Sequence, residues 1–175
     1  MRRFFDTNVL VYAHGRDDPV KRDLARASID EATAEDGFVV STQVLAEFYR
    51  TAVRLKVMGP AQARELVRVW SEHDTVVQTP ELLLRAISLH QDHSLAFWDA
   101  MIVQAALESR CDLIMTEDMQ HGRRFGDLEI VNPFIAPRAH EPRAAAYSAG
   151  RGRKRSRVLK PPQWSRGTRP GVRRR

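Results

Sequence analysis

Cysteine is almost missing from this chain, because Cys111 is the only one among 175 residues. A single cysteine excludes an intrachain disulfide and argues against a cysteine-based zinc site. Proteins without disulfides are typical of reducing compartments, so we expect a cytoplasmic protein.

Long apolar runs are missing as well. No stretch approaches the roughly 18 uninterrupted apolar residues of a membrane-spanning helix, and we therefore expect no association with a membrane. A strand-like pattern and an aspartate follow directly after the arginines near the N-terminus, where a secretory signal would need an apolar segment. The sequence also has no Gly-rich phosphate loop, no Ser–His–Asp arrangement and no Cys-x-x-Cys motif.

Lysine is scarce in residues 1–135, where Lys21 and Lys56 are the only two. A receiver domain of two-component signalling is another acidic α/β fold, but it needs paired acids after its first strand and a lysine late in the chain. The sequence therefore excludes that class. His90 and His93 are three residues apart, and no third convergent ligand accompanies them, so a zinc site there is not supported.

Charge divides the chain into two parts. Residues 136–175 contain 13 of the 28 basic residues and one of the 22 acidic ones, which leaves 15 basic and 21 acidic residues in 1–135. The first part therefore has a charge of −6 and the second of +12. We expect residues 1–135 to form one domain and residues 136–175 to be a disordered basic tail. The tail is either an RNA-tethering arm or an extension without a role.

Short apolar segments alternate with helical patterns along residues 1–135. Strands are predicted at 2–6, 38–40, 75–77, 113–115 and 128–131, and helices are predicted to begin near residues 8, 19, 42, 60, 80 and 97. This alternation predicts a three-layer α/β fold, with a mostly parallel five-stranded sheet and helices on both faces. In such sheets, functional sites lie outside the carboxyl ends of the strands.

Four acidic residues lie where a predicted strand ends or an apolar helix begins. They are Asp6, Glu47, Asp99 and Asp118. Carboxylates rarely enter a core without a partner or a metal, and four on one edge of a sheet would repel each other. A divalent cation with hard oxygen ligands, Mg²⁺ or Mn²⁺, would hold them together. Thr116, at the end of a predicted strand, places a hydroxyl group beside them.

Each acid also has a purely structural explanation. Asp6 would cap the helix at Asn8, and Asp118 would form a turn. Glu47 lies at the edge of its helix's buried face, where a glutamate commonly reaches into solvent. Asp99 would cap an apolar helix, whose N-terminus stabilises a negative charge.

The order and context of the motifs resemble the PIN-domain family. The motifs are Asp-Thr-Asn at residues 6–8, Ala-Glu-Phe at 46–48, Trp-Asp-Ala at 98–100 and Thr-Glu-Asp at 116–118. The resemblance covers about residues 3–134 and is closest to the VapC-type toxin nucleases of bacterial toxin–antitoxin pairs. Family members of this size normally end near residue 135, so the tail is a departure from the family.

The resemblance implies a ribonuclease site that depends on Mg²⁺ or Mn²⁺. The family's four acids map to Asp6, Glu47, Asp99 and Asp118, its hydroxyl residue to Thr116 and its supporting polar residue to Asn8. Asp6, Asp99 and Asp118 would coordinate the metal, and Glu47 would complete the cluster or orient the attacking water. The resemblance further implies an RNA substrate, an antitoxin partner that blocks the site, and a homodimer. The alternative function is a non-catalytic RNA- or protein-binding module with the same fold.

Overall fold

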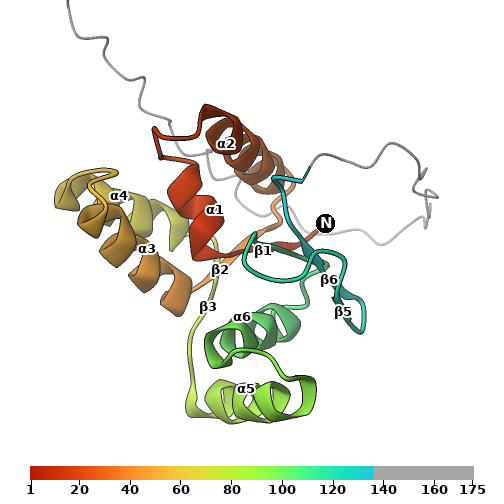
Figure 1. Ribbon diagram of the computed structural model, residues 1–175. Helices are drawn as coiled ribbons and strands as arrows, with labels where there is room; N and C mark the ends of the chain where they lie inside the picture. The colour runs from red at the N-terminus through yellow and green to blue at the C-terminus, as the bar shows by residue number, and fades with distance from the viewer. Residues whose placement is uncertain (136–175) are drawn as a thin grey trace, which may run out of the picture.

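A computed structural model describes residues 1–135 of the protein. A six-stranded sheet lies at its centre (Figure 1). The strands are β1 (Arg3–Phe5), β2 (Phe38–Ser41), β3 (Asp74–Val76), β4 (Leu113–Met115), β5 (Arg124–Phe125) and β6 (Leu128–Val131), arranged in the order β3-β2-β1-β4-β6-β5. All pairings are parallel except that of β5 with β6. The mostly parallel sheet is therefore confirmed.

The prediction of five strands was wrong by one. The additional strand, β5, has only two residues and pairs with β6 through a turn at Gly126, whose φ is +62°. Two residues are too few to show a periodic pattern in the sequence. They form a strand only because they pair with β6. The other five strands lie within a residue or two of the predicted ranges.

Helices cover both faces of the sheet. They are α1 (Thr7–Tyr12), α2 (Pro19–Ala34), α3 (Thr42–Arg54), α4 (Pro60–Trp70), α5 (Pro80–His93) and α6 (Phe97–Glu108). Figure 1 shows α1 and α2 on one side of the sheet and α5 and α6 on the other, so the three-layer prediction is confirmed. None of the helices in residues 1–135 is long and apolar enough to cross a lipid bilayer.

The helix starts follow from local sequence. The side chains of Asp18, Ser41 and Thr79 accept hydrogen bonds from backbone N–H groups in the first turns of α2, α3 and α5. Proline, which has no N–H to leave unsatisfied, is the first residue of α2, α4 and α5.

The centre of the sheet is apolar on both faces. Phe4 and Phe5 on β1 and Val39 and Val40 on β2 are all fully buried, as expected for parallel strands covered on both sides. In the parallel pairing of β1 with β4, Phe5 lies opposite Met115. The next residue of each strand, Asp6 and Thr116, therefore leaves the sheet at the same edge.

The predicted basic tail, residues 136–175, lies outside the described residues. The predicted domain boundary at residue 135 stays a prediction for the same reason.

Candidate active site

Asp6 lies at the end of β1 and has its two carboxylate oxygens engaged on different sides. Oδ1 accepts a hydrogen bond of 2.6 Å from the backbone N–H of Thr7 and caps α1. Oδ2 accepts a bond of 2.7 Å from the hydroxyl group of Thr116. The cap and the contact across the sheet edge therefore coexist in one side chain.

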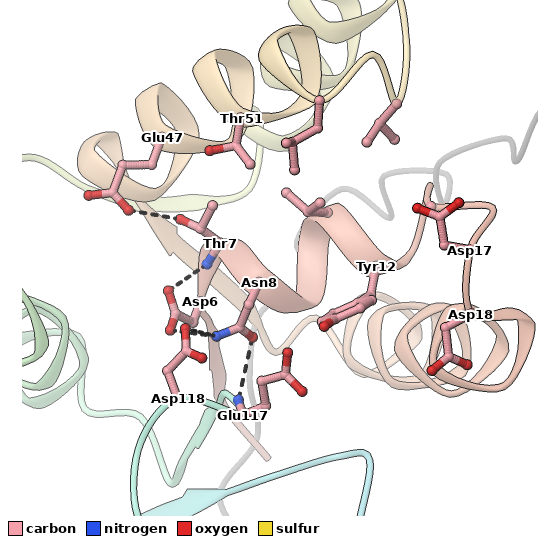
Figure 2. Close-up of a pocket in the computed structure, with 14 residues that line it drawn as sticks. Asp6, Thr7, Asn8, Tyr12, Asp17, Asp18, Glu47, Thr51, Glu117 and Asp118 are labelled. Atoms are coloured by element: carbon pink, nitrogen blue, oxygen red, sulfur yellow. Dashed lines mark hydrogen bonds between the residues drawn. The ribbon is translucent and has the colours of Figure 1, made fainter.

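Asn8 connects the residues of this edge. Its amide nitrogen lies 3.1 Å from Asp6 Oδ2, 3.0 Å from Thr116 Oγ1 and 2.9 Å from Asp118 Oδ2. Its carbonyl oxygen accepts a hydrogen bond of 3.4 Å from the backbone N–H of Glu117. Oxygens of Asp6, Thr116 and Asp118, from segments 110 residues apart, thus surround the amide nitrogen of Asn8. Figure 2 shows the carboxylates of Asp6 and Asp118 beside this amide.

Glu47 approaches the cluster from α3. One oxygen accepts a hydrogen bond of 3.2 Å from the hydroxyl group of Thr7, and the other accepts one of 3.0 Å from the amide of Gln43. Gln43 precedes Glu47 by one helical turn, so the two side chains share a face of α3. Sequence reasoning missed Thr7 and Gln43, although the position of Thr7 in the Asp-Thr-Asn motif and the i, i+4 spacing of Gln43 were both visible.

Asp118 and Asp99 complete the set. Asp118 is exposed in the loop after β4, and its backbone N–H donates to the hydroxyl group of Thr116 over 3.2 Å. Asp99 is half-buried in the first turn of α6. Its carboxylate is close enough to Asp118 for that charge to raise its pKa.

The acids of this edge disturb each other's protonation. Burial raises the pKa of Asp6 to about 6; the charges of Asp118 and Glu47 add to this rise, and the hydrogen bonds from Thr116 and Thr7 oppose it. Burial, and then the charge of Asp118, also raises the pKa of Asp99. Asp99 does not cap α6, because the N-cap residue is Ala96 and no side chain makes a capping hydrogen bond there. Asp118 is the carboxylate that acts on both of the others.

A cleft of about 580 Å³ opens beside the cluster. Its lining includes Asp6, Asn8, Glu47 and Asp118, which Figure 2 shows along one wall. Asp99 is not part of this lining and approaches the cluster from α6, on the other side of the sheet.

Lys21 on α2 is a further residue of the site that sequence reasoning missed. Its ammonium group forms an ion pair of 2.5 Å with Glu117 and donates to the hydroxyl group of Tyr12 over 3.2 Å. Glu117 lines the same cleft as Asp118. The scarcity of lysine in this part of the chain was the signal that could have identified Lys21.

The donor chemistry of the cluster suits a hard divalent cation. The oxygens of Asp6, Thr116 and Asp118 already surround the Asn8 amide, and the charges of Asp118 and Glu47 add to the rise that burial causes in the pKa of Asp6. Within residues 1–135, however, no three His, Cys, Asp or Glu side chains are arranged to hold a metal ion. The residue types fit an ion, and an ion would have to draw the carboxylates together.

The family of the protein follows from a comparison with family models. The model described as the PIN domain matches residues 3–124. The chain belongs to the PIN-domain family. This confirms the family suggested by the four motifs.

Several solved structures resemble this PIN domain in fold, among them the following two. One is VapC20 of Mycobacterium tuberculosis, a toxin that cleaves the sarcin-ricin loop; it is 15% identical, the TM-score is 0.52, and the match covers 66% of this chain and 89% of VapC20. The other is a chain of a toxin–antitoxin complex from Klebsiella pneumoniae, 20% identical, with a TM-score of 0.56 and coverage of 75% and 97%. No curated protein sequence matches this chain.

Proposed function

We propose that this PIN-domain protein is a metal-dependent endoribonuclease and the toxin of a toxin–antitoxin pair. The observation that carries the proposal is the convergence of Asp6, Thr116 and Asp118 on the Asn8 amide, beside an open cleft. The fold similarity to VapC20 and to a chain of a toxin–antitoxin complex supports it.

In this proposal, the metal ion is Mg²⁺ or Mn²⁺, and its ligands are Asp6, Asp99 and Asp118. A bound ion of this kind lowers the pKa of a coordinated water and neutralises charge on the phosphate to be cleaved. Asn8 and Thr116 hold the carboxylates of Asp6 and Asp118 in place through their hydrogen bonds.

Glu47 completes the acidic set in this proposal. Both of its oxygens are oriented, one by Thr7 and one by Gln43, so the carboxylate has a fixed position at the cleft wall. From there it would orient the water that attacks the phosphodiester or accept a proton from it.

Cleavage of RNA tests this function. The purified full chain should cleave RNA in Mg²⁺ or Mn²⁺, and EDTA should stop it. Asp99→Asn should lower the rate by at least a hundredfold, because it removes a proposed ligand. The matched control is Asp92→Asn, the same change at an exposed residue of α5, and it should keep full activity.

One observation favours the alternative function, a non-catalytic RNA- or protein-binding module. No three acidic or histidine side chains within residues 1–135 are arranged to hold an ion. Binding of RNA without cleavage in either metal, together with no Mg²⁺ binding by calorimetry, would establish the module and overturn the nuclease.

The proposed partners are an antitoxin and a second copy of the chain. A toxin requires an antitoxin that blocks its site, so a short gene for a DNA-binding protein directly upstream would support the pairing. A homodimer has a candidate surface where Leu83 on α5 and Trp98 on α6 line one hollow and are 39% and 60% exposed. Sedimentation of the wild type and of Leu83→Glu tests the homodimer.

A further inference from the structure

The cleft beside the acids combines an apolar wall with an unusual excess of negative charge. Six of the residues that line it are acidic, and none of the lining residues, all within the described chain, is basic. The six are Asp6, Asp17, Asp18, Glu47, Glu117 and Asp118. Val11, Leu55 and Val57 form an apolar wall, and the Leu55 side chain is 55% exposed. Such a groove repels phosphate and suits a cationic segment with a few apolar side chains.

The described chain ends at the rim of this same groove. Phe134 packs edge-on against Tyr12, a lining residue, with 5.1 Å between the ring centroids. The Lys21 ammonium group lies 4.4 Å from the centroid of the Tyr12 ring and 5.1 Å from that of the Phe134 ring. The same group forms the ion pair with Glu117, so Lys21 contacts both rings and the acid. Ile135, the last described residue, therefore lies close to the groove.

The sequence beyond this point has the matching charge. Residues 151–160, Arg-Gly-Arg-Lys-Arg-Ser-Arg-Val-Leu-Lys, contain six basic residues and no acidic one, and two of the others are the apolar Val158 and Leu159. Fifteen residues, 136–150, join Ile135 to this segment. A connection of that length reaches up to about 50 Å, which is ample for a return to a groove whose rim the chain has just left.

We propose that the groove binds residues 151–160 of its own chain. The basic side chains meet the acids of the rim, and Val158 and Leu159 contact the apolar wall of Val11, Leu55 and Val57. A tethered segment has an effective concentration in the millimolar range, so individually weak contacts suffice for occupancy. If the proposed function holds, the bound segment occupies the substrate's place and restrains cleavage until RNA or a partner displaces it.

Binding is tested on the full chain by NMR, with EDTA present so that metal has no influence. The test variant combines Arg153→Gln, Lys154→Gln and Arg155→Gln. The matched control combines Arg173→Gln, Arg174→Gln and Arg175→Gln, which removes the same charge at the chain end. The test variant should shift the backbone amide resonances of the groove residues Val11, Thr51 and Val57, and the control should leave them in place. Groove resonances that do not move in the test variant, or that move equally in both, would overturn the proposal.

A second measurement, the salt dependence of RNA affinity, shows whether residues 151–160 bind the groove or RNA. If the segment is an RNA arm, the test variant should reduce the salt slope of RNA affinity by about 0.7 per charge removed and leave the groove resonances unchanged. That outcome would also overturn the proposal.

A third measurement connects the segment to activity. At low salt the test variant should cleave RNA several-fold faster than the wild type, and the difference should vanish at high salt, which screens the attraction. Equal rates at low salt, with cleavage intact, would overturn the restraint. If no variant cleaves RNA, the nuclease assignment has failed, and the resonance shifts still decide whether the segment binds.

Discussion

At the scale of single residues, Asp6 links the start of α1 to the cluster at the sheet edge. One oxygen caps the helix through Thr7, and the other receives the Thr116 hydroxyl group. Because it is buried beside two other acids, it is also the carboxylate whose charge is most costly in the absence of metal. Its protonation should therefore be visible in the stability of the protein.

The first prediction is a pH dependence of stability that comes from Asp6. Its pKa is raised from 3.8 to about 6, so protonation stabilises the folded state below pH 4 and this contribution is lost as pH rises through 6. The difference between these two pKa values corresponds to at most about 3 kcal/mol in the free energy of unfolding. In EDTA, Asp6→Asn should match the wild type near pH 4 and exceed it in free energy of unfolding at pH 7. Urea unfolding at both pH values checks this, and a constant difference between the two proteins would contradict it.

The second prediction concerns the Asn8 amide, which donates to three oxygens. Asn8→Asp replaces the shared donor by another carboxylate and should lower the free energy of unfolding in EDTA by about 1–3 kcal/mol. Added Mg²⁺ should restore part of this loss, because an ion neutralises the added charge and binds only the folded state. Asn8→Ala is the control, since it removes the donor without adding charge, and Mg²⁺ should stabilise it less. Equal responses of the two variants to Mg²⁺ would contradict the role of Asn8.

At the scale of elements, the site depends on where strands end and helices begin. The ends of β1 and β4 supply Asp6, Thr116 and Asp118, and helices α3 and α6 bring Glu47 and Asp99. The close pairing of β1 with β2 sets the position of Asp6 relative to α3. Gly37, directly before β2, lies where this pairing begins, and its carbonyl oxygen accepts a hydrogen bond of 2.7 Å from Arg3.

The third prediction tests this close approach. A Cβ atom on Gly37 would lie 2.1 Å from the carbonyl oxygen of Met1, so Gly37→Ala must displace backbone. We expect a loss of roughly 1–3 kcal/mol in the free energy of unfolding. Gly59→Ala is the control, because a Cβ atom there meets nothing within 4 Å, and it should cost less than about 1 kcal/mol. Thermal unfolding of both variants checks the prediction. Equal losses of free energy of unfolding would show that Met1 moves away from the added Cβ atom at little cost, and would contradict it.

At the scale of the whole molecule, charge is distributed unevenly. Residues 1–135 carry −6 and residues 136–175 carry +12, and six of the 21 acidic residues of the first part line the cleft. Six acidic residues at the cleft repel a phosphate that approaches the site. A divalent metal bound there would reduce this repulsion, so in the proposed nuclease the binding of RNA should depend on metal as well as its cleavage.

The fourth prediction belongs to this scale, because it requires the complete chain in a cell. Expression of the full chain in bacteria should arrest growth if the protein is a toxin, and Asp99→Asn should abolish the arrest at equal protein level. Asp92→Asn should remain toxic. Toxicity of the wild type and Asp99→Asn to the same degree, measured by growth curves with immunoblots, would point to aggregation or to an effect of the tail.

The sequence by itself determined the elements and the family. Capping residues and prolines mark the starts of α2, α3 and α5, and apolar runs mark five of the six strands, because these signals act within a few residues. The motifs around Asp6, Glu47, Asp99 and Asp118 were sufficient to identify the PIN-domain family. The strand β5 was not predicted from the sequence, because two residues form a strand only when β6 is beside them.

Only the tertiary structure decided how the residues of the site meet. The parallel pairing of β1 with β4 brings Asp6 to within 2.7 Å of Thr116 across 110 positions of sequence, and it makes Asn8 the group that Asp6, Thr116 and Asp118 share. Burial raised the pKa of Asp6 and Asp99, and the packing of the chain brought the Lys21 ammonium group to within 2.5 Å of the Glu117 carboxylate. Distances, burial and mutual repulsion depend on which segments pack together, and local sequence patterns carry no information about that packing.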